Sequence, residues 1–223
     1  MSSPFQTGRY GVLLAALFAM ILVVPPTIAA GHGALALTLV YPAIFLASLL
    51  VASDEGVHRR ALFVGVALAV VGDFSLLFLD SPALVIGVRL IDIVLLAAIT
   101  WLLLVRILRE RSVSADTILG GMAVYLLLGV WFQTMYGLLE YLAPGSFAGP
   151  LHASDVVGVG RYPGFVYYSF VTLTTLGFGD VTPVHEVARS LSIAEALIGQ
   201  LYLAVLVASL VGMHLAGRSD RAD

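Results

Sequence analysis

Long apolar runs separated by short polar breaks make up most of this chain. An α-helix needs about 20 predominantly apolar residues to cross a bilayer, and six runs approach or exceed that length. In chain order the runs cover residues 10–30, 33–52, 61–79, 83–108, 116–140 and 186–216. The pattern therefore predicts an all-α integral membrane protein with six spans.

The first run contains two adjacent prolines, Pro25 and Pro26. Proline ends or kinks a helix because it lacks the backbone N–H and its ring clashes with the preceding turn. An alternative interpretation is a cleavable signal peptide, because a polar arm at 1–9 precedes the apolar core and small residues follow at 28–30. In both interpretations the second helix enters the membrane from outside.

Composition agrees with a membrane protein, since 60% of the 223 residues are hydrophobic and 11% are charged. Such a composition excludes a soluble enzyme. Cysteine is absent, which excludes disulfides and thiolate metal sites. The five histidines are scattered without a pair at ligand spacing, so we expect no transition metal. We also expect no organic cofactor and no nucleic-acid partner.

One apolar segment, 164–174, is too short to cross a hydrocarbon core of about 30 Å. It follows residues 142–163, which are polar and rich in Gly and Pro and suit a loop outside the membrane. A short segment must enter and return, and membranes permit this only where irregular backbone is buried in protein or lines water. We therefore predict a re-entrant pore helix at 164–174.

The stretch after this helix, 172–183, reads Thr-Leu-Thr-Thr-Leu-Gly-Phe-Gly-Asp-Val-Thr-Pro. Gly177 and Gly179 alternate with larger residues, and only glycine takes positive φ without steric cost, so successive carbonyls can point the same way. Four copies around an axis would stack rings of oxygens that replace the hydration shell of a monovalent cation. One copy per chain predicts a homotetramer.

Residues 168–183 resemble the pore loop of the potassium channel family, whose core pattern is Thr-Thr-Val-Gly-Tyr-Gly-Asp. The resemblance implies a K⁺ selectivity filter at 175–179, formed by Thr175, Leu176, Gly177, Phe178 and Gly179. Leu176 replaces the usual Val or Ile and Phe178 replaces Tyr, so a ring hydroxyl that ties the filter to its surroundings is missing. We expect selectivity to persist and the filter to be held less firmly.

The resemblance also assigns roles around the filter. It implies that Asp180 braces the filter through an aromatic donor, and either Tyr167 or Tyr168 fits that role. Thr182 stands at the outer mouth where an aromatic ring confers external tetraethylammonium block in the family, so we expect weak block. His185 would also lie at the mouth, and its protonation in acid would add positive charge there.

The last run carries two residues of interest. Gly199 lies twenty residues after Gly179, where the family's inner helix has its gating hinge, although close helix packing is an alternative reason for a glycine. Glu195 precedes Gly199 by about one helical turn on the same face. It is either protonated and hydrogen-bonded behind the filter or tunes cation occupancy, and the sequence leaves both open.

Three further ionisable residues, Asp73, Arg89 and Asp92, fall inside predicted spans. Counting from the turn at 80–82 places Asp73 and Arg89 at similar depth in adjacent antiparallel helices, and Asp92 is one turn from Arg89. Intramembrane charges are functional candidates by default. This cluster either fixes helix packing or takes part in gating.

The resemblance to the potassium channel family covers 116–217, and the preceding four helices match voltage sensors only in helix count. They lack an arginine at every third position, and one charge crossing 100 mV supplies about 2.3 kcal/mol. We therefore expect no steep voltage gating. The predicted organisation is a four-helix bundle followed by a pore module of helix, re-entrant helix with filter, and helix. Its segments are 1–9 (arm), 10–108 (four-helix domain), 109–115 (linker), 116–217 (pore) and 218–223 (tail).

The arginines set the expected orientation, because cytoplasmic loops are enriched in Arg and Lys. Most arginines fall on one side of a six-span arrangement: Arg9, Arg59, Arg60, Arg106, Arg109, Arg111, Arg218 and Arg221. We therefore expect a plasma-membrane protein with both termini in the cytoplasm. The mouth of the filter is expected on the outside.

The sequence thus predicts a homotetrameric potassium-selective channel that conducts passively, surrounded by membrane lipid. A weakly selective cation channel and a non-conducting accessory subunit remain alternatives, and an unidentified regulatory subunit is a further partner left open. A transporter would usually show paired broken helices in an internal repeat, and an enzyme would need a nucleophile with a base. Neither pattern is present, so we expect no enzyme activity.

Overall fold

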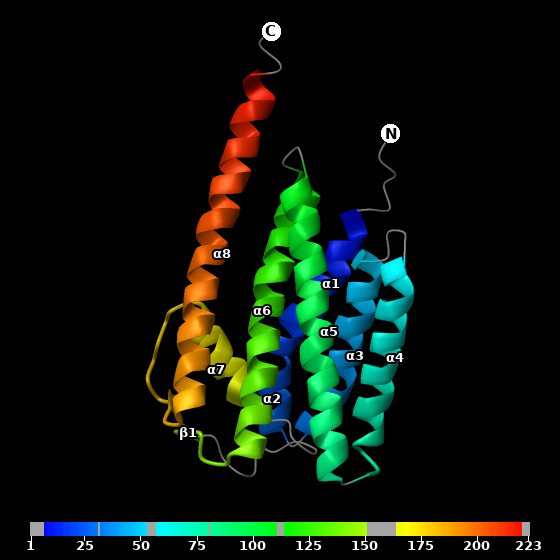
Figure 1. The fold of residues 1–223 in the computed structure, drawn as a ribbon, viewed down its shortest axis with the longest axis vertical. Coiled ribbons are helices and arrows are strands. Elements are labelled where there is room, and N and C mark those ends of the chain that lie inside the picture. Colours follow the sequence, from blue (N-terminus) through cyan, green and yellow to red (C-terminus); the bar gives the residue numbers. More distant parts are fainter. Residues whose placement is uncertain are drawn as a thin grey trace.

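The computed structural model describes residues 7–30, 32–52, 57–79, 81–110, 114–150 and 164–219. Most of the predicted arm, part of the linker, the loop residues 151–163 and the tail residues 220–223 lie outside the described residues. Most described residues are helical (Figure 1). The elements are α1 (Thr7–Leu22), α2 (Val24–Ala29), α3 (Gly33–Ala52), α4 (Val57–Ser75), α5 (Pro82–Arg109), α6 (Ala115–Leu142), β1 (Phe147–Ala148), α7 (Gly164–Leu173), β2 (Thr182–Pro183) and α8 (Glu186–Ser219).

The first predicted span is two helices. The break falls at Val23, directly before the prolines of α2. Pro25 cannot donate a backbone hydrogen bond and its ring crowds the preceding turn. The prediction that these prolines end or kink the helix is therefore confirmed.

Helix α4 is shifted from the predicted 61–79. It begins at Val57, so four residues expected in a polar loop are helical, and it ends at Ser75. The Ser75 hydroxyl donates to the Gly72 carbonyl at 2.6 Å, and such local side-chain bonds compete with helix continuation. The next turn tightens, because the Phe78 N–H bonds the Ser75 carbonyl only three residues back. Polar residues thus failed to mark the start of this helix.

Two smaller expectations are also corrected. Helix α8 continues to Ser219, so the first two residues of the predicted tail belong to it. The fold is mostly rather than purely helical, because β1 and β2 form an antiparallel pair in which Phe147 faces Pro183 and Ala148 faces Thr182. This pair joins the loop after α6 to the segment after the filter.

Three described helices are long and apolar enough to cross a membrane by length and composition: Pro82–Arg109, Ala115–Leu142 and the Glu186–Gly212 part of α8. Shorter apolar helices cover Tyr10–Leu22, Ala36–Val51 and Gly164–Leu173. The chain is therefore a multi-pass membrane protein. That all four amino-terminal runs cross the bilayer stays a prediction.

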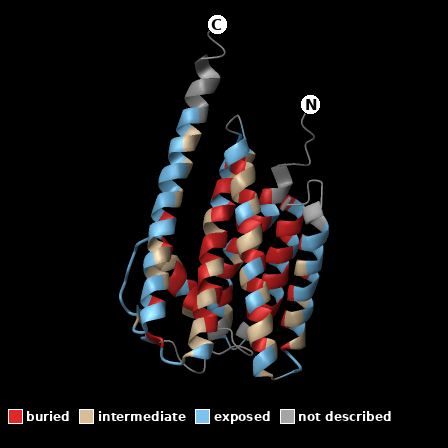
Figure 2. Ribbon diagram, viewed as in Figure 1, coloured by how far each residue is buried: buried red, intermediate tan, exposed pale blue. Residues whose placement is uncertain are grey.

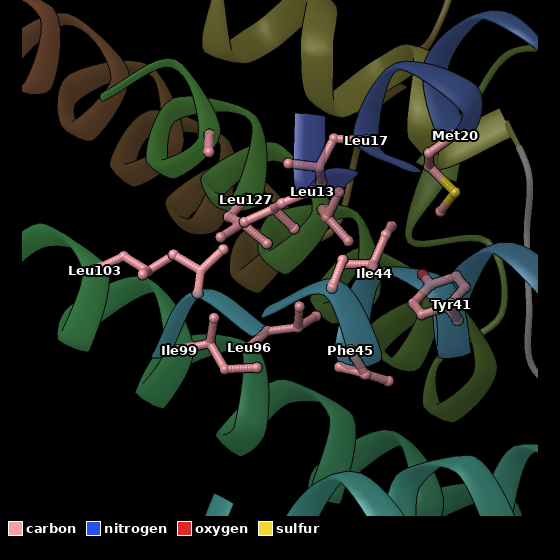
Figure 3. Close-up of a cluster of buried hydrophobic side chains, with 14 of the residues drawn as sticks. Leu13, Leu17, Met20, Tyr41, Ile44, Phe45, Leu96, Ile99, Leu103 and Leu127 are labelled. Carbon is pink, nitrogen blue, oxygen red and sulfur yellow. The ribbon is translucent and has the colours of Figure 1, made fainter. Parts of the chain in front are cut away.

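The main core lies where α1, α3 and α5 meet α6 (Figure 3). Its side chains are aliphatic and aromatic and almost fully buried; they include Leu13, Leu17, Ile44, Phe45, Leu96, Ile99, Leu103 and Leu127. Polar contacts add to it, since the Trp131 indole N–H of α6 donates to the Ile93 carbonyl of α5 at 3.0 Å. The four-helix part is therefore packed directly on the pore module of its own chain.

Helices α5 and α6 form an antiparallel hairpin with a short connection, as Figure 1 shows. Ser114 is the N-cap of α6, because its hydroxyl accepts from the Thr117 N–H at 3.1 Å and the Thr117 hydroxyl accepts from the Ser114 N–H at 3.3 Å. Such a reciprocal capping box satisfies N–H groups that a helix start leaves without partners.

Helix α8 stands apart from the bundle. It contacts α6 and α7 from its beginning as far as Leu206, which lies against Gly121 of α6, while residues 207–212 beyond these contacts are mostly exposed (Figure 2). Helix α1 begins and α8 ends at the same end of the molecule (Figure 1).

Candidate pore site

Helix α7 is held by a cluster of aromatic rings. Phe165 and Tyr168 of α7 pack against Tyr136 of α6 and Phe147 of β1, and the cluster is completed by Phe132, Val181 and Ala188. The ring centroids of Phe147 and Phe165 are 4.7 Å apart and those of Tyr136 and Tyr168 are 5.1 Å apart, both edge to face. This arrangement is favourable for aromatic quadrupoles. These ring contacts hold α7 against α6 and β1.

The chain folds back on α7 as it leaves the helix. The N–H groups of Leu176 and Gly177 both donate to the Val171 carbonyl, at 2.9 and 3.3 Å. A carbonyl of the preceding helix therefore accepts from two backbone N–H groups of the predicted filter. The filter backbone is therefore anchored to α7 through its donors.

The conformation of the filter alternates as the two glycines predict. Gly177 has φ +59° and Gly179 has φ +77°, and the intervening residues do not share this region. Thr175 extends the alternation with φ +59°, which is uncommon for a residue with a Cβ. No feature of the sequence predicted positive φ at this threonine.

Asp180 is braced by Tyr167. The Tyr167 hydroxyl donates to Asp180 Oδ2 at 2.8 Å, and the Tyr167 ring stacks on Phe178 with centroids 6.2 Å apart and planes 9° apart. One tyrosine therefore holds the filter at two points. The stacked ring partly replaces the hydroxyl that Phe178 lacks.

Tyr168, the alternative candidate for the brace, has a different partner from Asp180. Its hydroxyl lies 2.6 Å from Ser192 Oγ of α8 and its ring is buried in the aromatic cluster. Adjacent residues on an α-helix point about 100° apart. When Tyr167 faces Asp180, Tyr168 must face elsewhere, and here it ties α7 to α8.

The residues at the filter's outer end lie beside the short β pair. A Cβ built on Gly149 would lie 2.3 Å from the Asp180 carbonyl, so a glycine is needed where the loop crosses Asp180. Thr182 is exposed in β2. His185 is also exposed, and its Nδ1 accepts from the Val187 N–H at 3.2 Å at the start of α8.

Glu195 of α8 is fully buried behind α7. The Tyr136 hydroxyl of α6 donates to Glu195 Oε2 at 2.5 Å. Glu195 Oε1 lies 2.5 Å from Ser169 Oγ of α7, which is also 2.8 Å from the Gly129 carbonyl of α6. Its carboxyl group therefore joins the three helices of the pore module.

Gly199 allows α8 to approach the end of α7. A Cβ at this position would lie 2.6 Å from the Leu173 carbonyl and 2.9 Å from Leu173 Cδ1. The close-packing explanation therefore has a direct structural basis. The role of Gly199 as a gating hinge stays a prediction, and α8 is a continuous helix through this position.

The three ionisable residues that fall inside predicted spans lie together in the four-helix part. Arg89 bonds Asp73 Oδ1 at 3.0 Å and Asp92 Oδ2 at 2.7 Å, and all three side chains are buried. The cluster therefore joins α4 to α5. These helices lie on the far side of α6 from α7 and α8 (Figure 1).

Three polar residues near the filter were not singled out from the sequence. Gln200 Nε2 donates to Thr175 Oγ1 at 3.3 Å. The Tyr125 hydroxyl donates to the Leu173 carbonyl at 3.2 Å, and the Tyr202 hydroxyl donates to the Gly121 carbonyl at 2.7 Å. Polar residues in apolar runs are the signal that could have found them.

Comparison with known proteins agrees with this arrangement. A family model described as an ion channel matches residues 117–214, from the first turn of α6 to the last turns of α8. Protein LctB of Bacillus caldotenax is 32% identical over 114 residues, which are 51% of this chain and 84% of that protein. Two pore potassium channel c of Oryza sativa subsp. japonica is 36% identical over 95 residues, which are 41% of this chain and only 17% of that protein.

Proposed function

The chain belongs to the ion channel family, and we propose that it works as a potassium-selective channel that conducts K⁺ passively as a homotetramer. The observation that carries the proposal is the alternating positive φ at Thr175, Gly177 and Gly179. Alternation of hands turns successive carbonyls toward one side, as an oxygen-lined cation path requires. Membership of this family agrees with the expectation that the protein is not an enzyme.

Potassium is the proposed ion for two reasons. The filter stretch resembles that of potassium channels, and one of the similar proteins is named a potassium channel. Leu176 and Phe178 depart from the usual pattern, and Phe178 is supported by its stacking on Tyr167. This contact favours a selective filter over a weakly selective one.

The homotetramer is supported by what a single chain leaves uncovered. Residues 174–180 are all exposed, although their backbone is irregular. Irregular backbone at membrane depth must be buried in protein or line water. Four copies around the filter would provide both environments, with lipid around the outside.

The proposed orientation has both termini in the cytoplasm and the filter mouth outside, in the plasma membrane. It is supported by the arginine distribution. The common end of the molecule at which α1 begins and α8 ends agrees with an even number of crossings (Figure 1).

The test is the reversal potential of purified protein in planar bilayers, with a potassium gradient opposed by sodium. We expect reversal near the potassium equilibrium potential. Gly177→Ala should abolish selectivity, because alanine is strained at φ +59°. Gly145→Ala is the matched control, since Gly145 has φ +84°, equally open surroundings and a position outside the filter.

Other results would identify the alternatives. Reversal midway between the potassium and sodium equilibrium potentials would indicate a weakly selective cation channel. Complete absence of current in reconstituted tetramers, under voltage, acid, tension or varied lipid, would contradict autonomous conduction. Co-purification with a second channel chain would then identify an accessory subunit.

A further inference from the structure

Two hydrogen-bond acceptors compete for the single proton of Ser169. A serine hydroxyl carries one hydrogen, yet Ser169 Oγ lies 2.8 Å from the Gly129 carbonyl and 2.5 Å from Glu195 Oε1. A carbonyl oxygen can only accept, so the Ser169 hydrogen belongs to the Gly129 contact. The contact with Glu195 then needs a hydrogen from Glu195 itself. Only a carboxylic acid supplies one.

The surroundings of Glu195 favour the same protonation state. Tyr136 donates its one hydrogen to the other carboxyl oxygen, so all three short contacts are satisfied when Glu195 is neutral. In the described part of the chain, Glu195 forms no ion pair with an arginine or histidine. A buried carboxylate without a positive partner is costly. The cluster Asp73, Arg89 and Asp92 shows how this chain pairs buried charges elsewhere.

The position of this acid relates it to the filter. Glu195 meets Ser169, and four residues further along both helices Gly199 meets Leu173. The two contacts are one helical turn apart on α7 and on α8. Together they fix the register of α7 against α8. Because Thr175 is only the second residue after the end of α7, that register determines where the filter begins.

We propose that Glu195 is an uncharged carboxylic acid that donates to Ser169, accepts from Tyr136 and so positions the pore helix behind the filter. Glu195 is a positioning residue, because it touches α6 and α7 and not the ion path. It neither carries charge to the pore nor contributes a ligand. Its consequence for conduction rests on the proposed potassium channel function, whereas its protonation does not.

The protonation is tested by infrared difference spectroscopy of the full chain in lipid at neutral pH, comparing wild type with Glu195→Gln. We expect the variant to lose a carboxylic acid C=O stretching band. Loss of a carboxylate band instead would overturn the proposal. Ser169→Ala is a second variant, in which the acid band should shift because its hydrogen-bond acceptor is gone.

The positioning role is tested by reversal potentials of the same preparations. Glu195→Gln should keep wild-type selectivity, because a carboxamide can donate to Ser169 and accept from Tyr136. Glu195→Ala and Ser169→Ala should raise the sodium-to-potassium permeability ratio, by about tenfold for loss of both bonds. An unchanged permeability ratio in both alanine variants would overturn the positioning role of Glu195. The fraction of intact tetramer, measured in parallel for each variant, separates a misplaced filter from unfolded protein.

Failure of this inference and failure of the proposed function are distinguishable. A wild-type protein without potassium selectivity contradicts the channel function, while the infrared result still reports the protonation of Glu195. A selective wild-type protein with a carboxylate at Glu195 contradicts the inference alone.

Discussion

The four-helix part and the pore module are both built mainly from apolar helices, but they differ in how much of those helices is buried within one chain. Of the most apolar stretch of each long helix, 39% is buried in α5 of the four-helix part and 61% in α6, on which that part packs, whereas only 22% is buried in α8. Figure 2 shows the contrast between α6 and the part of α8 up to residue 212. The first region buries its core against α6 within one chain, while outward-facing apolar side chains such as Val94 and Trp101 stay exposed. The second leaves its filter and α8 exposed, as expected of surfaces that meet other copies, water or lipid.

The two regions also differ in how they satisfy buried polar groups. The four-helix part pairs ionised side chains, with Arg89 between two aspartates. The pore module uses hydroxyl donors, with Tyr136 on Glu195 and Tyr167 on Asp180. We therefore expect variants of the first region to change stability and variants of the second to change ion selectivity.

The largest expected effect is on stability, from Arg89→Met. Removing one member of a buried ion cluster leaves uncompensated charge, so we expect a loss of about 3–5 kcal/mol. Arg189→Met is the matched control, because Arg189 forms an i,i+3 pair with Glu186 that is exposed. It should lose about 0–1 kcal/mol.

The measurement is denaturant unfolding in detergent micelles, followed by reversal potentials of the surviving channels. Equal stability losses in the two arginine variants would contradict the contrast between a buried and an exposed pair. A shifted reversal potential in folded Arg89→Met channels would instead link the charge cluster to the filter.

Gly199→Ala should have the next largest effect, at the contact between α8 and α7. Alanine ordinarily favours a helix by about 1 kcal/mol relative to glycine, but here its Cβ would meet backbone at 2.6 Å. Overpacking costs about 1–3 kcal/mol, and we expect a displaced pore helix with reduced potassium current.

The matched control is Gly212→Ala in the same helix, where no atom of the described chain lies within 4 Å of the added Cβ. It should conduct normally. Wild-type current per tetramer from Gly199→Ala in single-channel recordings would show that the close approach is dispensable.

Tyr167→Phe should have a smaller effect, confined to the persistence of conduction. The variant keeps the ring that stacks on Phe178 and loses the hydrogen bond to Asp180. We expect the current under sustained activation to decay several-fold faster. Tyr168→Phe, which loses the contact with Ser192 and leaves the bond between Tyr167 and Asp180 in place, should decay at the wild-type rate, and equal decay in the two variants would refute the assignment of the brace.

The smallest expected effect concerns external acid. His185 is exposed at the filter's outer end, and protonation at Nδ1 would add positive charge and remove its hydrogen bond with Val187. Acid should therefore reduce inward cation current modestly in the wild type and less in His185→Ala. Identical acid titrations of current in the two proteins would rule out His185 as the sensor.

Several features of the fold and the site could be predicted from the sequence. Apolar run length predicted the long helices, because the bilayer fixes how many apolar residues a span needs. Gly177 and Gly179 predicted the alternating filter backbone, since only glycine adopts positive φ without steric cost. Pro25 and Pro26 predicted a helix break through local backbone chemistry.

Tertiary structure alone decided which residues meet. Tyr167 and Tyr168 are equivalent as phenol donors in the sequence. Only the rotation of α7 within the aromatic cluster places the Tyr167 hydroxyl, and not that of Tyr168, against Asp180. The reason for Gly199 appears only when α8 lies against Leu173. The sequence by itself determined what each segment can adopt, because those preferences are local. Packing between helices decided the partners of Glu195, because hydrogen bonds between distant segments depend on their relative placement.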